Sequence, residues 1–476
     1  MFISTSSTKI IMSVMHSTSP VMETDDKTIT GMLVGLTFLI ATAGILGFIS
    51  SNTNIFEKLS TVFLQILLGI SIIFLLAIFA NYKALDLLQD HARIILFTCW
   101  RLIFITFGGF FALIGLLILP GSFIGGAIFL GIAGLIFGIY LYTWRFVRIR
   151  LERSAEWITI ATTVVLKEPG MIGIAIIQSI IISITAVMEI FTIWAWNSYA
   201  TEQAVNQNNA HLIAYGIMFI YLWISFSVLY FYDGANTVIA YIRIKGGDPT
   251  VGQGFSASFN KFFAIIGFAL ITTTVTVIVR ALKNASNRNK DPDSRKSDDN
   301  IAAAILMAFL SVFGAMFGSI ILFIYNMMTF FTLPAIVIRN KGTLAAMGES
   351  KDLFNAHAWD IVFGDTGYGF ASFAMYIFSG GILGFIGFIY GYFVISASST
   401  IIPAFWFGII MAIIALAIGW SLTKFFLRPL YTSIVTTMYV YATEGPAELK
   451  IVPDSLKTHI NQTINSPRGL PIHMRH

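Results

Sequence analysis

Two acidic residues lie inside long apolar segments, and they are the residues of this chain best suited to chemistry. Glu189 occurs in AVMEIFTIWAW and Asp233 occurs in LYFYDGANTVIAY. An acidic side chain at the centre of a bilayer costs about 2.5–3.5 kcal/mol on insertion scales, so an acid that persists there is a candidate functional group. A carboxylate in such a place can bind a cation or relay a proton.

The surroundings of Asp233 favour a cationic ligand. Gly234 follows it, and a helix that opens at this glycine would free backbone carbonyls beside the carboxylate. Tyr230 and Tyr232 flank it, and aromatic rings can hold an organic ammonium by cation–π contact. Asp233, Tyr230 and Tyr232 are therefore predicted to bind substrate. The alternatives are that Asp233 pairs with a basic residue of another helix or lies near a membrane interface.

Glu189 and Asn326 complete the set of predicted substrate-binding residues. Glu189 is close to the outer end of its apolar segment, where water alone would explain it. Asn326 lies within IYNMMTFF, where hydrogen bonding between helices is the alternative role. His357 and Asp360 are three residues apart, a spacing that permits a shared metal, but two ligands do not make a site, and a solvated helix face is favoured.

Catalytic and metal-binding motifs are missing from the sequence. It contains no GxxxxGK[ST], HExxH or GxSxG motif and no Cys/His cluster. Its single cysteine, Cys99, excludes an internal disulfide and a thiolate metal cluster. The net charge of +5 is assigned to Lys and Arg at the cytoplasmic face, since no basic run is interleaved with aromatics. We predict no enzyme activity, no cofactor, no metal and no nucleic-acid partner.

The composition requires a lipid environment. Hydrophobic residues make up 57% of the 476 residues and charged residues only 11%, against about 25% charged in soluble proteins. A helix needs about 20 apolar residues to cross the hydrocarbon core, and lipid offers an open backbone no hydrogen-bond partner. The sequence thus predicts an all-α, polytopic membrane protein with about ten transmembrane helices. The ten segments are 31–49, 59–80, 102–119, 122–141, 170–195, 212–242, 260–281, 301–338, 371–395 and 401–423.

Basic residues set the predicted orientation. They gather in the connections after the second, fourth, sixth and eighth segments, which the positive-inside rule assigns to the cytoplasm. Both termini are therefore predicted to be cytoplasmic, with the protein in the plasma membrane. The connection 282–300 does not follow the positive-inside rule, because its five basic residues lie on the predicted outer side of the membrane.

Three amphipathic stretches, 151–173, 251–267 and 342–364, each precede a predicted hairpin and are expected to form interfacial elbow helices. Two segments exceed the length of a straight crossing, so they must tilt, protrude or break. Gly234 and Pro334 are the expected weak points. The predicted organisation is a tail (1–30), a four-helix module (31–145), a six-helix domain of three elbow-and-hairpin units (146–445) and a C-terminal tail (446–476).

Three stretches carry a resemblance to a known family: 246–282, 329–364 and 433–445. With them, residues of about 150–445 resemble a prokaryotic family of uncharacterised integral membrane proteins, a domain of unknown function with about six helices. This resemblance implies a fold and no activity. A more distant similarity is to choline-transporter-like proteins, through RFVRIRLERSAEW and the ATEGP turn at 442–446.

Two hypotheses for function follow. In the first, the protein is a transporter or permease that moves a small solute, with a cation favoured, past Asp233. In the second, it is a non-transporting scaffold, a lipid-organising protein or a subunit of a membrane complex, with a homo-oligomer or another membrane protein as partner. The small-residue run at 121–138 would suit such an interface. The first hypothesis requires polar surroundings for Asp233, and the second predicts an ion-paired or interfacial Asp233.

Overall fold

The computed structural model describes residues 53–202, 207–288, 316, 318–395 and 404–451. Of these residues, 93% are helical and none forms a strand. Eight helices in the described ranges are long and apolar enough to cross a membrane, which confirms the all-α polytopic class. The segment 31–49, the tail 1–30 and most of 446–476 lie outside the described residues, and the division at 145 stays a prediction.

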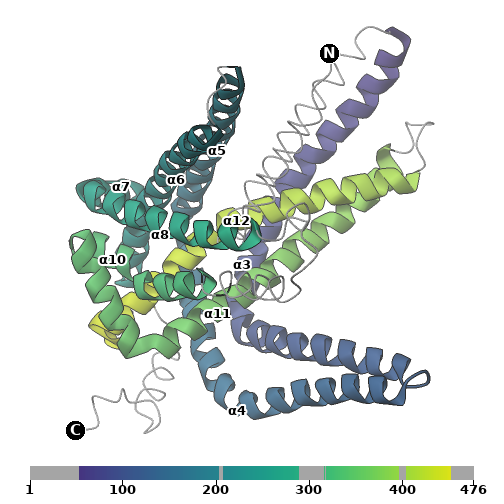
Figure 1. Ribbon diagram of the computed structural model, residues 1–476, viewed down its shortest axis with the longest axis horizontal. Helices are drawn as coiled ribbons and strands as arrows, with labels where there is room; N and C mark the ends of the chain where they lie inside the picture. Colours follow the sequence, from purple (N-terminus) through teal and green to yellow (C-terminus); the bar gives the residue numbers. More distant parts are fainter. Residues whose placement is uncertain (1–52, 203–206, 289–315, 317, 396–403, 452–476) are drawn as a thin grey trace, which may run out of the picture. The chain divides into compact units, whose positions relative to one another are not determined.

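The described residues form two compact units. Unit 1 contains the described parts of Ile174–Ala235 and Gly252–Asp352. Unit 2 contains the described parts of Ile49–Gly173, Asn236–Val251 and Leu353–His476. The helices are α3 (Thr53–Ile118), α4 (Phe123–Lys167), α5 (Gly170–Glu202), α6 (Gln207–Ile244), α7 (Val251–Asn260), α8 (Phe262–Arg288), α10 (Thr332–Val337), α11 (Thr343–Tyr390) and α12 (Ala404–Glu444) (Figure 1).

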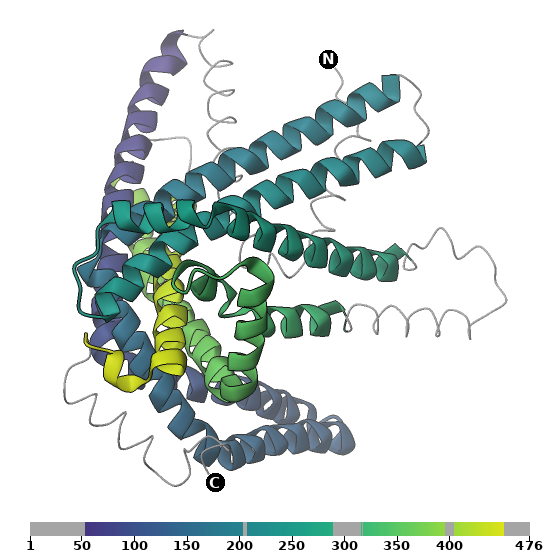
Figure 2. The ribbon, with the colours of Figure 1, turned by 90° about the vertical axis from the view of Figure 1, so that its left-hand side faces the viewer.

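Helix α3 joins two of the predicted segments. The residues 81–101, expected to form a connection, are helical throughout. They contain no Gly or Pro, and Leu85, Leu88, Ala92 and Leu96 recur at helical spacing and are at most 2% exposed. The non-helical backbone angles of His91 mark a kink, at which α3 changes direction (Figures 1 and 2).

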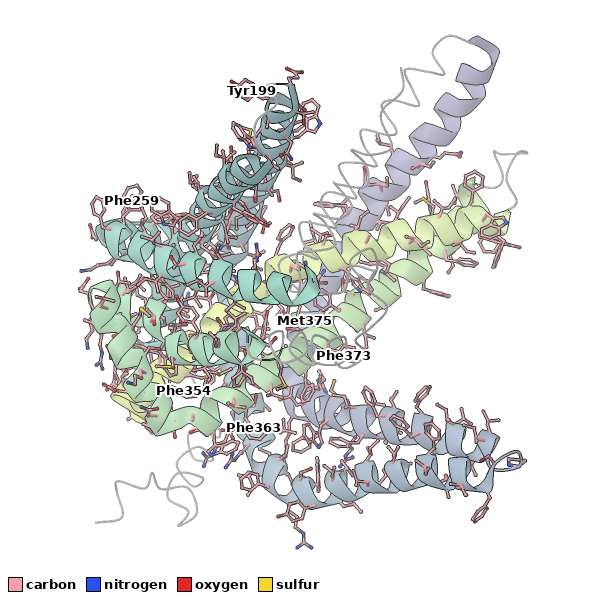
Figure 3. All side chains as sticks on the ribbon, in the orientation of Figure 1. Tyr199, Phe259, Phe354, Phe363, Phe373 and Met375 are labelled. Atoms are coloured by element: carbon pink, nitrogen blue, oxygen red, sulfur yellow. The ribbon has the colours of Figure 1, made fainter. Side chains whose placement is uncertain are left out.

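The second part of α3 and the first part of α4 form a hairpin, which we call the α3–α4 hairpin (Figure 2). The two helices approach closely at glycines: a Cβ on Gly126 would lie 2.9 Å from the Gly115 carbonyl oxygen. The Ser122 side chain caps α4 by accepting a hydrogen bond from the Gly125 amide. Apolar side chains project from the outside of the hairpin, as Figure 3 shows, and exposed apolar surface of this kind suits contact with lipid.

The three predicted elbow stretches differ from one another. Residues 151–167 continue α4 without a break and are largely buried within unit 2, with Leu151 and Ile158 fully covered. The second stretch contains a separate ten-residue helix, α7. The third is the first part of α11, which kinks at His357. Among the described residues, only α7 is thus a separate short helix, because no glycine or proline separates 151–167 from the preceding segment. Its place at the membrane interface stays a prediction.

One of the two predicted weak points is wrong. Helix α6 runs unbroken through Gly234, so no carbonyls are freed beside Asp233. Gly234 serves close packing instead, since a Cβ there would lie 2.8 Å from the Ser258 Oγ and 3.2 Å from Val337. The other expectation is confirmed: a turn at 330–331 separates helical residues 318–329 from α10, which contains Pro334.

Helices α11 and α12 pack through glycines in unit 2. A Cβ on Gly387 would lie 2.5 Å from the Met411 carbonyl oxygen and 2.6 Å from the Ala415 Cβ. A Cβ on Gly391, the first residue of the π-helical turn that follows α11, would likewise meet the Phe407 carbonyl oxygen. These glycines let the two backbones approach more closely than any side chain would allow.

Charged residues join the end of α6 to the end of α12, in an arrangement that we call the clasp. Lys245 donates hydrogen bonds to Glu444 and Glu448, both at 2.5 Å. The backbone amide of Lys450 donates to the Ile244 carbonyl at 3.0 Å. Gly445, with φ of 88°, allows the turn after α12, which explains the glycine of the ATEGP segment.

The clasp predicts a defined pH range of stabilisation. Burial opposes the charge of Lys245, but its hydrogen bonds to Glu444 and Glu448 outweigh burial and raise the pKa of the ammonium. The Lys245 hydrogen bond lowers the pKa of Glu448. Glu448 therefore contributes to folding stability at pH values above its unfolded pKa of about 4.3. This stabilisation is lost as the pH falls through the lower pKa of the folded state. Lys245 contributes to folding stability at pH values below its unfolded pKa of about 10.4. This stabilisation is lost as the pH rises through the higher pKa of the folded state.

We therefore expect Lys245→Met to lower the thermal unfolding temperature at neutral pH. The difference from wild type should shrink in acid, where Glu448 is protonated. Unfolding followed by tryptophan fluorescence across pH measures this difference. Lys351→Met, at an exposed lysine, is the matched control and should leave the unfolding temperature unchanged. A difference that persists unchanged in acid would show that the clasp does not stabilise through these charges.

Candidate functional site

Asp233 lies inside unit 1, between α5 and α6. Its side chain is 5% exposed. The Gln178 side chain of α5 donates through Nε2 to Asp233 Oδ1 at 3.2 Å and to the Leu229 carbonyl oxygen at 2.9 Å. Gln178 is itself only 2% exposed. The carboxylate is thus buried among helices and oriented by an amide, and it does not face lipid.

Tyr230 lies one helical turn before Asp233, on the same side of α6. Its hydroxyl donates to Thr272 Oγ1 of α8 at 3.3 Å. Thr272 Oγ1 also lies 2.9 Å from the Tyr325 hydroxyl, and it donates to the Phe268 carbonyl oxygen at 3.0 Å. Three hydroxyl groups from three helical segments therefore form a connected polar cluster.

The ring of Tyr230 packs on Phe268, with 4.6 Å between the ring centroids. This contact places two aromatic rings beside the hydroxyl cluster. An aromatic face near a carboxylate is the combination that attracts organic cations. Of the two predicted tyrosines, Tyr230 is thus the one that the structure places in the polar cluster.

Tyr232 belongs to a different cluster. Its ring contacts Phe231 and the α7 residue Phe255, with centroid distances of 5.6 Å in both cases. Phe259 of α7 also contacts Phe231, and Figure 3 shows it at the edge of α7. Because Tyr232 is rotated about 100° from Phe231 and 200° from Tyr230 around the helix, it faces α7 and not the hydroxyl cluster.

Glu189 of α5 has an electrostatic partner. It is half-buried, and Arg280 of α8 lies close enough to interact with its charge. One turn further along α5, Thr192 shares a hydrogen bond of 2.8 Å with the Tyr221 hydroxyl of α6. Water at the end of a segment is therefore not the sole explanation for Glu189.

Asn326 does not join the cluster. It lies on the exposed side of its helical segment, whereas the adjacent Tyr325 points to Thr272. Adjacent residues of a helix point about 100° apart, so both cannot face the same neighbour. The structure thus places Asp233 and Tyr230 on one side of α6 and Glu189 on α5 of the same unit, and it leaves Tyr232 and Asn326 outside the hydroxyl cluster.

Sequence reasoning missed three residues: Gln178, which orients Asp233, and Thr272 and Tyr325 of the hydroxyl cluster. Each is a single polar residue in an apolar segment, which alone predicts little, because Thr and Gln often only bond the helix backbone or a neighbouring helix. The sequence did hold one signal for Gln178, its spacing from Glu189. The two residues are separated by about three helical turns, which places them on one side of α5.

His357 and Asp360 do not form a solvated helix face, contrary to the expectation from their spacing. Asp360 pairs through Oδ1 with Arg153 of α4 at 3.2 Å, and His357 Nδ1 lies 3.8 Å from Asp360 Oδ2. The His357 ring also contacts the Tyr441 ring of α12. These residues connect helices of unit 2. In the described part of the chain, no group of three or more His, Cys, Asp and Glu residues could hold a metal.

A comparison with protein-family models gives a match. Residues 212–291 match the model described as "Family of unknown function (DUF6159)". The matched segment contains Tyr230, Tyr232 and Asp233, together with the first of the three stretches that resemble an uncharacterised family. No curated protein matches the chain. The chain is thus similar, over α6, α7 and α8, to a family without an assigned activity.

Proposed function

We propose that this membrane protein is a transporter or permease for a small cationic solute that binds at Asp233. The observation that supports the proposal most is the burial of the Asp233 carboxylate beside Gln178. Burial of a carboxylate in an apolar helix bundle costs free energy, so a buried acid in a membrane protein is a candidate functional group. The Gln178 amide orients this carboxylate.

The neighbouring groups suit an ammonium ligand. Gln178 donates to Asp233 Oδ1, which fixes the carboxylate orientation without neutralising its charge. The ring of Tyr230, one turn from Asp233 on α6, packs against the ring of Phe268 on α8. Charge attraction to the carboxylate and cation–π contact with the rings would together select an organic cation over a neutral solute.

Further polar groups of unit 1 also support transport over a purely structural role. The hydroxyl cluster of Tyr230, Thr272 and Tyr325 joins three helical segments. Glu189 and Arg280 add a pair of opposite charges to α5 and α8. Ionisable and polar groups facing the interior of a helix bundle commonly mark the path of a solute or proton.

Uptake into proteoliposomes tests the proposal. Purified protein is reconstituted and offered radiolabelled solutes in three groups: small organic ammonium ions, neutral analogues of similar size and carboxylate anions. We expect accumulation of at least one ammonium ion above the level in protein-free vesicles. If no ammonium ion enters faster than into protein-free vesicles, or if all three groups enter equally, the proposal is wrong.

A scaffold or complex subunit is the second candidate. Gly131, Gly134 and Gly138 of α4 follow helical spacing, and a Cβ on each would meet nothing within 4 Å. A face of small residues that is open in this way suits close packing against another transmembrane helix. This candidate predicts a stable oligomer or complex in mild detergent together with the absence of solute uptake.

We also propose that the protein lies in the plasma membrane with both termini in the cytoplasm. The clustering of Lys and Arg in alternate connections supports this orientation. The single native cysteine is 7% exposed, so introduced cysteines can be labelled against a low background.

Labelling of intact cells with an impermeant maleimide tests the orientation. Gly121→Cys, in the connection between α3 and α4, should be labelled from outside the cell. Lys351→Cys, on exposed residues of α11, should be labelled only after the membrane is opened. The reverse pattern would invert the proposed topology. Ser294→Cys, in the connection outside the described residues, reports the side of the segment that disagrees with the charge rule.

A further inference from the structure

The α3–α4 hairpin fixes the depth of two arginines. Between Arg101 and Arg145 the sequence contains no charged residue. The apolar arm of α4 from residue 123 to 143 rises about 30 Å, at about 1.5 Å per residue, which matches the hydrocarbon thickness of a bilayer. When the hairpin crosses the membrane, its base therefore places Arg101 and Arg145 together in one headgroup layer.

Aromatic rings hold Arg101 at this base. The Arg101 guanidinium lies 5.2 Å from the centre of the Trp144 ring. Phe97 packs edge-on against Trp144, with 5.4 Å between the centroids. A guanidinium stacked on a ring keeps its in-plane N–H donors available beyond the edge of the ring. Trp144 itself suits the interface, where tryptophan is enriched.

Two acidic residues near the base of the hairpin, Glu152 and Asp360, pair with other arginines. Glu152 pairs with Arg93 at 2.5 Å and with Arg148 at 3.4 Å, and Asp360 pairs with Arg153. Among the described residues, no ion pair joins Arg101 or Arg145 to a carboxylate. Both arginines are exposed. Two positive charges are thus presented at the base of the hairpin without a protein anion beside them.

The exposed apolar side chains next to these arginines point to a lipid as the ligand. Leu102 and Leu141 are 49% and 68% exposed, and Tyr142 is 86% exposed. A ligand that meets this surface needs acyl chains beside the apolar residues and an anionic group at the level of the arginines. Guanidinium groups bind phosphate through two parallel hydrogen bonds, which a phospholipid headgroup can accept.

We infer that the base of the α3–α4 hairpin binds an anionic phospholipid, whose phosphate contacts Arg101 and Arg145 and whose chains lie along Leu102 and Leu141. The site is independent of the proposed transport at Asp233, because it uses other residues in unit 2. A free phosphate shares the headgroup chemistry but lacks the chains, so the two sources can be distinguished by competition.

Lipid retention tests the site. The full chain is purified from vesicles of phosphatidylcholine with phosphatidylglycerol, and the bound lipid is measured by native mass spectrometry during stepwise delipidation. We expect wild type to retain phosphatidylglycerol preferentially. The double variant Arg101→Gln/Arg145→Gln should lose this preference about 30-fold, from about fivefold for each basic residue. Thermal unfolding in phosphatidylcholine alone confirms that the variant is folded.

The matched control is Arg339→Gln/Lys351→Gln, which removes the same charge from unit 1. Glu349 keeps Lys341 as a partner in this control, at 2.9 Å. We expect the control to retain phosphatidylglycerol as wild type does. The inference is overturned if the two double variants behave alike, or if inorganic phosphate displaces the lipid from wild type, since the site would then recognise charge alone or a soluble anion.

Discussion

Asp233→Asn should slow uptake of the transported ammonium ion at least about 30-fold, because loss of one partner of a buried charge pair costs about 2 kcal/mol or more. The asparagine has nearly the same shape and can still accept the Gln178 hydrogen bond, so the fold should remain intact. The change therefore removes the negative charge and little else. Initial rates of uptake into proteoliposomes, at equal amounts of reconstituted protein, measure the effect.

The matched control is Asp352→Asn, which makes the same chemical change at an exposed aspartate of unit 1. It should transport at the wild-type rate. Asp233→Glu retains the charge but displaces it, so its rate should fall between those of wild type and Asp233→Asn. If Asp233→Asn is folded, by its unfolding temperature, and still transports as wild type does, Asp233 is not the binding group.

Gly387→Ala should destabilise unit 2 by about 3 kcal/mol, the upper range for overpacking a tight core. The added methyl group would lie 2.5 Å from the Met411 carbonyl oxygen and 2.6 Å from the Ala415 Cβ. The first of these atoms belongs to the backbone of α12, so no rotation of a side chain can relieve the overlap. The two helices must move apart and lose contacts along the whole crossing.

Gly381→Ala, six residues earlier in α11, provides the comparison. A Cβ there meets nothing within 4 Å, and the residue is exposed. Alanine is favoured over glycine in a helix by about 1 kcal/mol, so this variant should be as stable as wild type or slightly more stable. Thermal unfolding in detergent compares both variants. Equal stabilities would mean that α11 and α12 are not packed at Gly387.

Much of the fold could be predicted from the sequence, because a backbone that crosses lipid must satisfy its hydrogen bonds within the protein. Nine of the ten predicted segments fall wholly or partly within the described helices, since long apolar runs have one economical structure in a bilayer. The error at 81–101 came from its charges, such as Lys83, Asp86 and Arg93, which suggested a connection. Leucines at helical spacing on the opposite side keep that stretch helical and buried.

The candidate site was only partly predictable. Asp233 could be found because an acid is rare in an apolar segment. Gln178 could not, because its role depends on how α5 lies against α6, and apolar segments carry little information on that register. Gly234 was mispredicted for the same reason. A glycine permits either a break in the helix or a close contact with a neighbouring helix, and the sequence does not show that Ser258 lies against it.

The continuity of α6 through Asp233 has a consequence for which cations could be chosen there. The carbonyl oxygens of an intact helix remain occupied by its own amides, and Leu229 additionally accepts from Gln178. A sodium or potassium ion needs several such oxygens to replace its shell of water. The alkyl groups of an alkyl ammonium ion cover part of its charge, so fewer bound water molecules must be removed when it binds. The unbroken helix would thus act as a filter based on dehydration, admitting organic cations while leaving alkali ions in solution.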